Sequence, residues 1–201
     1  MASGKERAWK NLSGCIPGEV CARADVTYDE ARSVYVVRSF GQDILVCPTD
    51  RTLKAQTPVG ERMLMRYDHF AALAILSYLG NARATPPSGH WVKPADLRSG
   101  DIYYRGSHVL PLEGLSKVYE GRLPDFAAHG ALLGGSPLSF GDVSAKLLPL
   151  PRVPVAVILW KGDEEFPGRA DLLLDSTCEV YLPADIIWSV AMLSVLMMCQ
   201  A

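Results

Sequence analysis

The stretch that decides the fold is Val155-Ala-Val-Ile-Leu-Trp160, an unbroken apolar run made mostly of β-branched and aromatic residues. A short continuous run of this kind is typical of a strand that is buried on both faces of a sheet. Gly162-Asp-Glu-Glu-Phe-Pro-Gly168 follows as a turn, and Ala170-Asp-Leu-Leu-Leu174 returns as a second strand. The sequence therefore predicts two connected strands, of which the first is the central strand of the sheet.

A hairpin and a long helix are predicted upstream of this pair. Val34–Phe40 and Ile44–Cys47 are rich in β-branched and aromatic residues, and Gly41-Gln-Asp43 separates them. This is the clearest hairpin pattern in the chain. Apolar residues then recur at helical spacing over 61–79, which predicts a long amphipathic helix.

Three further helices are expected. Two shorter ones cover Leu110–Tyr119 and Leu123–Leu133, and the last begins near Pro183, where proline suits a helix start. Its apolar stretch Ile186–Met198 is shorter than the roughly 20 residues that span a bilayer. Because a helix that is apolar on all sides is normally covered by protein, it is expected to be a long C-terminal core helix. Asp101–Arg105 is a candidate short strand.

The order of these elements points to an α+β fold, with a mixed or antiparallel sheet packed against several helices, because strands and helices do not alternate regularly. The chain has 201 residues, of which 49% are hydrophobic and 21% charged, and this favours one globular domain. Residues 1–30 form a weakly determined N-terminal extension, in which Cys15–Gly18 is expected to be a loop.

Charge and cysteine content narrow the classes of function. Lys and Arg number 20 against 22 Asp and Glu, and the basic residues are scattered, so nucleic-acid binding is disfavoured. No apolar run follows the basic residues near the start, so we expect a cytoplasmic protein without a membrane partner. The five cysteines include no C-x-x-C pair, which argues against a disulfide framework and favours reduced, mostly structural thiols.

Carboxylates supply one candidate site. Asp163, Glu164 and Glu165 follow the predicted central strand, and such a cluster suits a divalent cation or general acid-base work. Asp171 and Asp175 lie four residues apart around the returning strand, and Asp175 is a candidate fourth ligand. The alternative is an ordinary solvated acidic turn.

Aromatic and imidazole side chains supply the other candidate site. In Ser88-Gly-His-Trp91 the glycine permits close backbone approach, while His90 and Trp91 can stack on a planar ligand and donate hydrogen bonds to it. His69 on the long helix is a candidate axial ligand or proton donor. The alternatives are a packed loop and a half-exposed histidine. No histidine pair has the H-E-x-x-H spacing of a zinc enzyme.

Several motifs carry a resemblance to a known family. They include Leu150-Pro-Arg-Val-Pro154, Leu159–Pro167, Leu172–Ser176 and Ser88–Trp91. Over about residues 60–200 the chain resembles an uncharacterised family of anaerobic bacteria and archaea, a domain of unknown function. Some relatives resemble fusions behind a four-cysteine iron-sulfur segment similar to that of corrinoid iron-sulfur proteins. The resemblance implies an anaerobic redox or tetrapyrrole context, in which an iron-sulfur or corrinoid-type redox protein would act in trans.

Two functions remain open from the sequence. The first is a non-catalytic binding or accessory module in anaerobic redox or cofactor metabolism, holding a planar, tetrapyrrole-like ligand or a redox partner. Its candidate binding residues are His69, His90, Trp91 and Trp160. The second is a carboxylate-based or divalent-metal-dependent enzyme that uses Asp163, Glu164, Glu165 and Asp175. We favour the first because aromatic surface is more evident than a nucleophile or base. The identity of the ligand and the presence of any catalysed reaction stay open.

Overall fold

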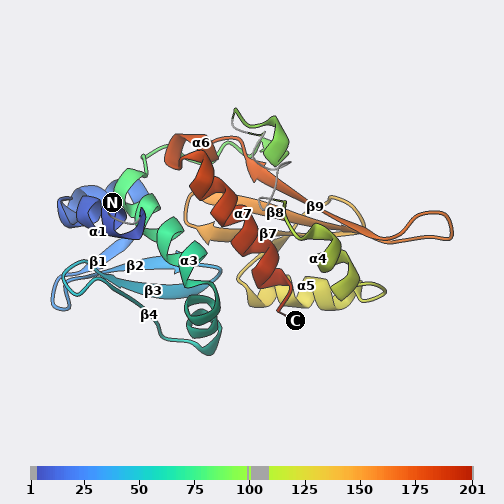
Figure 1. The fold of residues 1–201 in the computed structure, drawn as a ribbon, viewed down its shortest axis with the longest axis horizontal. Coiled ribbons are helices and arrows are strands. Elements are labelled where there is room, and N and C mark those ends of the chain that lie inside the picture. The colour runs from blue at the N-terminus through green and yellow to red at the C-terminus, as the bar shows by residue number, and fades with distance from the viewer. Residues whose placement is uncertain (1–3, 99, 101–108, 201) are drawn as a thin grey trace.

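The computed structural model describes residues 4–98, 100 and 109–200, and within them the fold is α+β, as expected (Figure 1). The helices are α1 (Gly4–Ser13), α2 (Pro17–Ala24), α3 (Pro58–Asn81), the short 3₁₀ turn η1 (Pro94–Asp96), α4 (Leu112–Val118), α5 (Leu123–Leu132), α6 (Cys178–Tyr181) and α7 (Ala184–Met198). The strands are β1 (Thr27–Asp29), β2 (Val34–Ser39), β3 (Gln42–Cys47), β4 (Thr52–Ala55), β5 (Trp91–Val92), β6 (Ser136–Pro137), β7 (Val143–Leu150), β8 (Val153–Trp160) and β9 (Arg169–Asp175). The strand expected over Asp101–Arg105 lies outside the described residues.

The strands form two separate antiparallel sheets. The first has the order β1-β2-β3-β4, and the second has the order β5-β9-β8-β7-β6. The hairpin expected before residue 50 is confirmed as β2 and β3, which turn at Phe40 and Gly41 with positive φ angles of 47° and 72°. The central strand expected at Val155–Trp160 is confirmed as β8, which lies in the middle of the second sheet.

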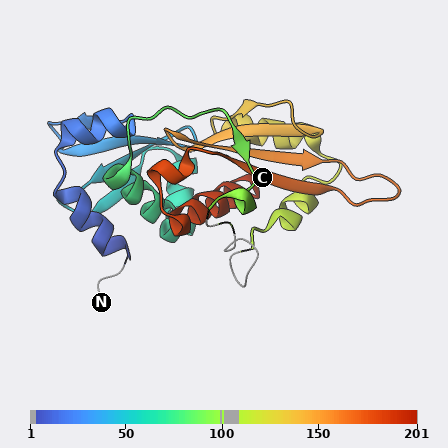
Figure 2. The ribbon, with the colours of Figure 1, turned by 90° about the horizontal axis from the view of Figure 1, so that it is seen from above.

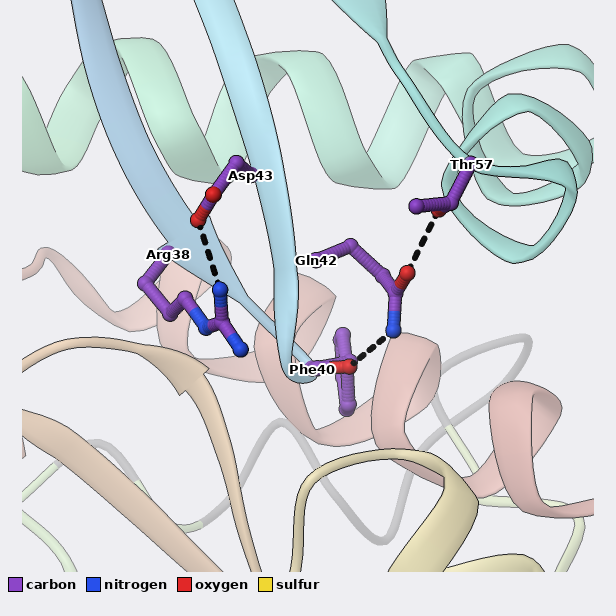
Figure 3. A network of polar contacts seen from close by, with 5 residues as sticks. All are labelled: Arg38, Phe40, Gln42, Asp43 and Thr57. Carbon is purple, nitrogen blue, oxygen red and sulfur yellow. Dashed lines mark hydrogen bonds and ion pairs between the residues drawn. The ribbon is translucent and has the colours of Figure 1, made fainter.

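The long helix α3 begins at a capped N-terminus that is tied to the first sheet. The Thr57 hydroxyl accepts a hydrogen bond from the Gly60 amide. It donates one to the Gln42 side chain, which in turn donates to the Phe40 carbonyl (Figure 3). Pro58 occupies the first helical turn, where its missing N–H costs nothing. The predicted helix is confirmed, with a kink at Tyr67, where φ is −128° and ψ is 28°.

Helix α7 is the core helix that its composition predicts. It packs against α3 and against β7 and β8 (Figure 1). Of its 15 residues, 11 are buried. Helix α4 lies against β9 and α5 against β7, so these helices add to the cover of the second sheet. None of the helices among the described residues combines the length and apolar character that a membrane crossing requires.

The two sheets meet at one tight junction. The Phe40 amide, at the β2–β3 turn, donates a 2.8 Å hydrogen bond to the Leu148 carbonyl of β7. Gly41 and Gly134 lie against each other, both with positive φ, and a Cβ built on either would come within 2.9 Å of the other's Cα. Only glycine fits both the backbone conformation and this approach.

The first 30 residues contribute to the core. Trp9 and Leu12 of α1 are buried, and α1 packs along α3. Helix α2 starts at Pro17, so the loop expected over Cys15–Gly18 is wrong in its second half, because proline there occupies a first helical turn. The Tyr78 hydroxyl donates to the Ala24 carbonyl at 2.8 Å, which fastens the end of α2 to α3.

Candidate functional site

A pocket of about 770 Å³ lies over β8 and β9 of the second sheet. Its walls come from three segments: residues 93–95 around the start of η1, residues 109–112 leading into α4, and residues 139–141 before β7. Its floor comes from β8 and β9. Leu172 and Leu173 both line it, and consecutive strand residues point to opposite faces, so the pocket wraps the edge of β9.

Three polar and aromatic side chains form a connected cluster on this floor. The Trp160 indole N–H donates a 2.8 Å hydrogen bond to the Asp171 carboxylate. The Arg169 guanidinium lies over the Trp160 ring, 4.7 Å from the ring centroid, and its Nε is 3.6 Å from the same carboxylate oxygen. The indole is therefore held at its N–H and on one face. Its exposed fraction is still 36%, so part of the ring is open to the pocket that it lines.

Strand register explains why these residues meet. Trp160 pairs with Arg169, and Ile158 pairs with Asp171. Paired residues of antiparallel strands share a face, so all four lie on one side of the sheet, while the intervening residues of β8 and β9 face the core beneath α7 and α4. The diagonal from Trp160 to Asp171 is within reach of an indole.

The wall formed by residues 139–141 depends on a glycine. Gly141 has a φ of 58°, and a Cβ there would lie 2.6 Å from a methyl carbon of Ile158 and 2.9 Å from the Leu159 carbonyl oxygen. The backbone therefore rests directly on β8, and the half-buried Phe140 beside it lines the pocket. The result is a mostly apolar pocket with one aromatic side chain on the wall and another on the floor.

Asp175, at the C-terminal end of β9, does not have the metal-ligand role that the sequence predicted. Its carboxylate is fully buried and accepts hydrogen bonds from the amides and hydroxyls of Ser88 and Thr177 and from the Gly89 amide. Burial alone would raise the pKa of Asp175, but hydrogen bonds from Thr177, Ser88 and Gly89 outweigh it and lower the pKa. This carboxylate anchors the loop before β5.

The acidic turn lies at the opposite end of β9 from Asp175. Asp163, Glu164 and Glu165 are exposed at the tip of the β8–β9 hairpin, which projects beyond the body of the domain (Figures 1 and 2). The Asp163 carboxylate accepts hydrogen bonds from the Phe166 and Glu165 amides, which lower its pKa. The structure thus does not bring Asp175 to the other three carboxylates. Among the described residues no group of three or more His, Cys, Asp or Glu is arranged to hold a metal ion.

Only one of the four candidate binding residues lines the pocket. Trp160 lies on its floor, whereas His69 is exposed on α3, where its ring meets the edge of Phe70 at 5.5 Å. His90 is exposed and Trp91 half-buried beside the Asp175 anchor, and neither lines the pocket.

Sequence reasoning missed Arg169, Asp171, Phe140 and Lys93 as pocket residues. Side chains alternate between the two faces of a strand, so pairing the two predicted strands across their turn could have placed Arg169 and Asp171 on the same face as Trp160. No local pattern identifies Phe140 or Lys93, because only tertiary structure brings them to the strand.

Cys178, which is buried at the start of α6, is not a nucleophile at neutral pH. Burial, followed by the charges of Glu179 and Asp175, raises the pKa of Cys178 to about 12. The thiolate is the reactive form, so a thiol with this pKa is inert. Cys178 therefore acts as a small core residue, in agreement with its sequence environment.

Comparison with known proteins places the chain in a family. A model of the family described as Domain of unknown function (DUF3786) matches residues 17–197. The chain belongs to this DUF3786 family. No curated protein and no solved structure matches it. The matched segment includes α2 and all nine strands described here, so the pocket beside Trp160 lies within the DUF3786 domain.

Proposed function

We propose that this DUF3786 domain is a non-catalytic binding module whose ligand places a planar, largely apolar body in the pocket beside Trp160. The observation that carries the proposal is an exposed indole held in place at the floor of an apolar pocket. Large apolar pockets with a few convergent polar groups are the usual sites of small-molecule binding. The volume of about 770 Å³ is in the range of such sites.

The indole is organised before any ligand arrives. Asp171 fixes the N–H, and Arg169 covers one ring face, so little rotational freedom is left for a ligand to remove. A pre-organised aromatic side chain binds a ligand more tightly, because it loses less conformational entropy when the ligand binds. Planar ligands favour offset or edge contacts with such a ring, at centroid separations of about 4.5–7 Å.

A binding role fits this pocket better than an acid-base role. Asp171 is the single carboxylate among the described lining residues, and it is already engaged by Trp160 and Arg169. A general base needs a carboxylate that can reach a substrate proton. The lining otherwise offers the Ser139 hydroxyl, the Lys93 ammonium and the Arg169 guanidinium, and Asp171 is the only base among the lining residues that the structure describes.

The redox context is part of this proposal. Some relatives resemble fusions of this domain behind an iron-sulfur segment. This resemblance supports a cofactor of anaerobic metabolism, such as a tetrapyrrole-like chromophore, as the ligand. It also supports a redox protein as the electron donor or acceptor of that ligand. An absorption spectrum of the protein purified without oxygen from its own host tests this part. A visible band that is lost on Trp160→Leu is the expected result, and a spectrum with no band above the tryptophan peak contradicts a chromophoric ligand.

The binding role itself is tested with 1-anilinonaphthalene, a neutral dye with a planar naphthalene ring whose fluorescence increases in apolar surroundings. Trp160→Leu is expected to weaken dye affinity about tenfold, because it removes an aromatic contact and part of the apolar floor. His69→Ala and His90→Ala are the controls, since both side chains are exposed and lie outside the pocket, and they should leave affinity unchanged. A loss confined to the histidine variants would overturn the assignment.

A further inference from the structure

We propose that the ligand of this pocket carries an anionic group, and that Lys93 receives this group at the rim. The inference rests on the proposed binding role and names the chemical class of its ligand: a planar organic anion. It follows from how the charges around the pocket are paired.

Three charged side chains line the described part of the pocket: Lys93, Arg169 and Asp171. Asp171 is committed, because its carboxylate accepts the Trp160 indole N–H at 2.8 Å and lies 3.6 Å from the Arg169 guanidinium. The Arg169 charge balances that of the carboxylate, and the indole N–H occupies the same oxygen. Among the three charged side chains of the described lining, one positive charge is left over.

That charge is the Lys93 ammonium, which is exposed and forms no ion pair or hydrogen bond with any residue that the structure describes. An unpaired ammonium beside an apolar wall attracts an anion and repels a cation.

The backbone that carries Lys93 is held in place. Lys93 follows β5, in which Trp91 pairs with Asp175 and Val92 with Leu174, and it precedes the buried Pro94 that starts η1. The Asp175 anchor therefore contributes to the pocket indirectly, since it fixes the loop that leads into β5. Lys93 is thus placed by rigid neighbours while its ammonium remains available.

The test compares two dyes that differ in one group. 8-Anilinonaphthalene-1-sulfonate has the ring system of 1-anilinonaphthalene and adds a sulfonate. Lys93→Gln is expected to weaken sulfonate-dye affinity about three- to fivefold, the range of a partly exposed ion pair. It should leave affinity for the neutral dye within twofold. The matched control is Lys54→Gln on β4, an exposed lysine of the other sheet, which should change neither affinity.

Salt provides a second readout. Affinity of the unmodified protein for the sulfonate dye should fall as sodium chloride rises from about 50 to 500 mM, since ions screen the contact with Lys93. Lys93→Gln should remove most of this dependence. The neutral dye should show none in either protein.

The failures of the two proposals are distinguishable. If Lys93→Gln affects both dyes equally, or neither, while Trp160→Leu still weakens neutral-dye binding, the anion inference is overturned and the binding role stands. If the unmodified protein binds neither dye, or Trp160→Leu changes neither affinity, the binding role fails and the anion inference fails with it. Lys93 is exposed, so an unchanged circular dichroism spectrum is expected for Lys93→Gln.

Discussion

Asp171 and Asp175 lie four residues apart on β9 and on the same face of the strand, yet they have different roles. Asp175 is fully buried, and surrounding amides and hydroxyls satisfy its carboxylate. Asp171 is half-buried at the pocket, where it orients Trp160 and pairs with Arg169. One end of β9 is therefore a structural anchor, and the other end orients the indole that lines the pocket.

The difference arises from what packs against each end of the strand. At Asp175 the loop that contains Ser88 and Gly89 runs back over the strand and delivers N–H donors. At Asp171 no backbone donor reaches the carboxylate among the described residues, and its partners are side chains that a ligand can also contact. A buried carboxylate is kept where donors satisfy it, as at Asp175.

The largest expected effect comes from Asp175→Asn. The new amide keeps one oxygen for the four donors on Oδ1, but its NH2 group faces the Gly89 amide, which loses its acceptor. The remaining hydrogen bonds also lose the carboxylate charge that strengthens them. We expect a loss of about 3 kcal/mol in the free energy of unfolding, measured by urea denaturation. Asp171→Asn is the matched control on the same strand and should lose less than about 1 kcal/mol. Equal losses would remove the distinction between the two aspartates.

Low pH should reduce the difference in stability between the unmodified protein and Asp175→Asn. The pKa of Asp175 is lowered in the folded state, so its contribution to stability is present above the pKa of the unfolded chain, about 4. It is lost as the pH falls from there through the folded-state value. The stability gap between the unmodified protein and Asp175→Asn should therefore narrow as the pH falls from about 5 towards the folded-state pKa of Asp175. A gap that stays constant over this range contradicts a buried ionised carboxylate.

A smaller effect is expected at Asp171, and on binding instead of stability. Asp171→Ala removes the acceptor of the Trp160 indole N–H, so the ring loses an anchor and affinity for 1-anilinonaphthalene should fall about threefold. Asp171→Asn keeps an acceptor oxygen and should stay close to the unmodified affinity. If both variants bind the dye equally well, Asp171 does not position the indole.

The smallest effect is expected from the acidic turn. Glu164→Gln combined with Glu165→Gln should leave both the urea midpoint and dye affinity unchanged, because both side chains are exposed at the hairpin tip. Calorimetry with magnesium, calcium and manganese should show no binding heat in the unmodified protein. Binding heat that is seen in the unmodified protein and lost in the double variant would instead support a metal-dependent enzyme that uses these carboxylates.

Local patterns predicted the elements that are locally determined. The β2–β3 hairpin, α3, the β8–β9 pair and α7 each carry their own periodicity or apolar run, and each is confirmed. Strand β7 was missed because Lys146 and Pro149 interrupt its apolar residues. The division into two sheets was also missed, since pairing between distant strands leaves no local pattern.

The candidate site was predicted only in part, for the same reason. Trp160 was found because it ends a run that defines a strand. Lys93 and Phe140 reach the pocket through tertiary structure alone. Asp175 was grouped with the acidic turn because the two are near in sequence, but a full strand separates them.

The most direct test of the binding role is an amide and indole ¹⁵N NMR titration with 1-anilinonaphthalene. The chain has four tryptophans, Trp9, Trp91, Trp160 and Trp188, which give four separate indole N–H signals. We predict that the Trp160 signal shifts as dye is added, while the signals of Trp9, Trp91 and Trp188 stay in place. A shift at Trp91 with none at Trp160 would contradict the account and return the site to the loop around His90.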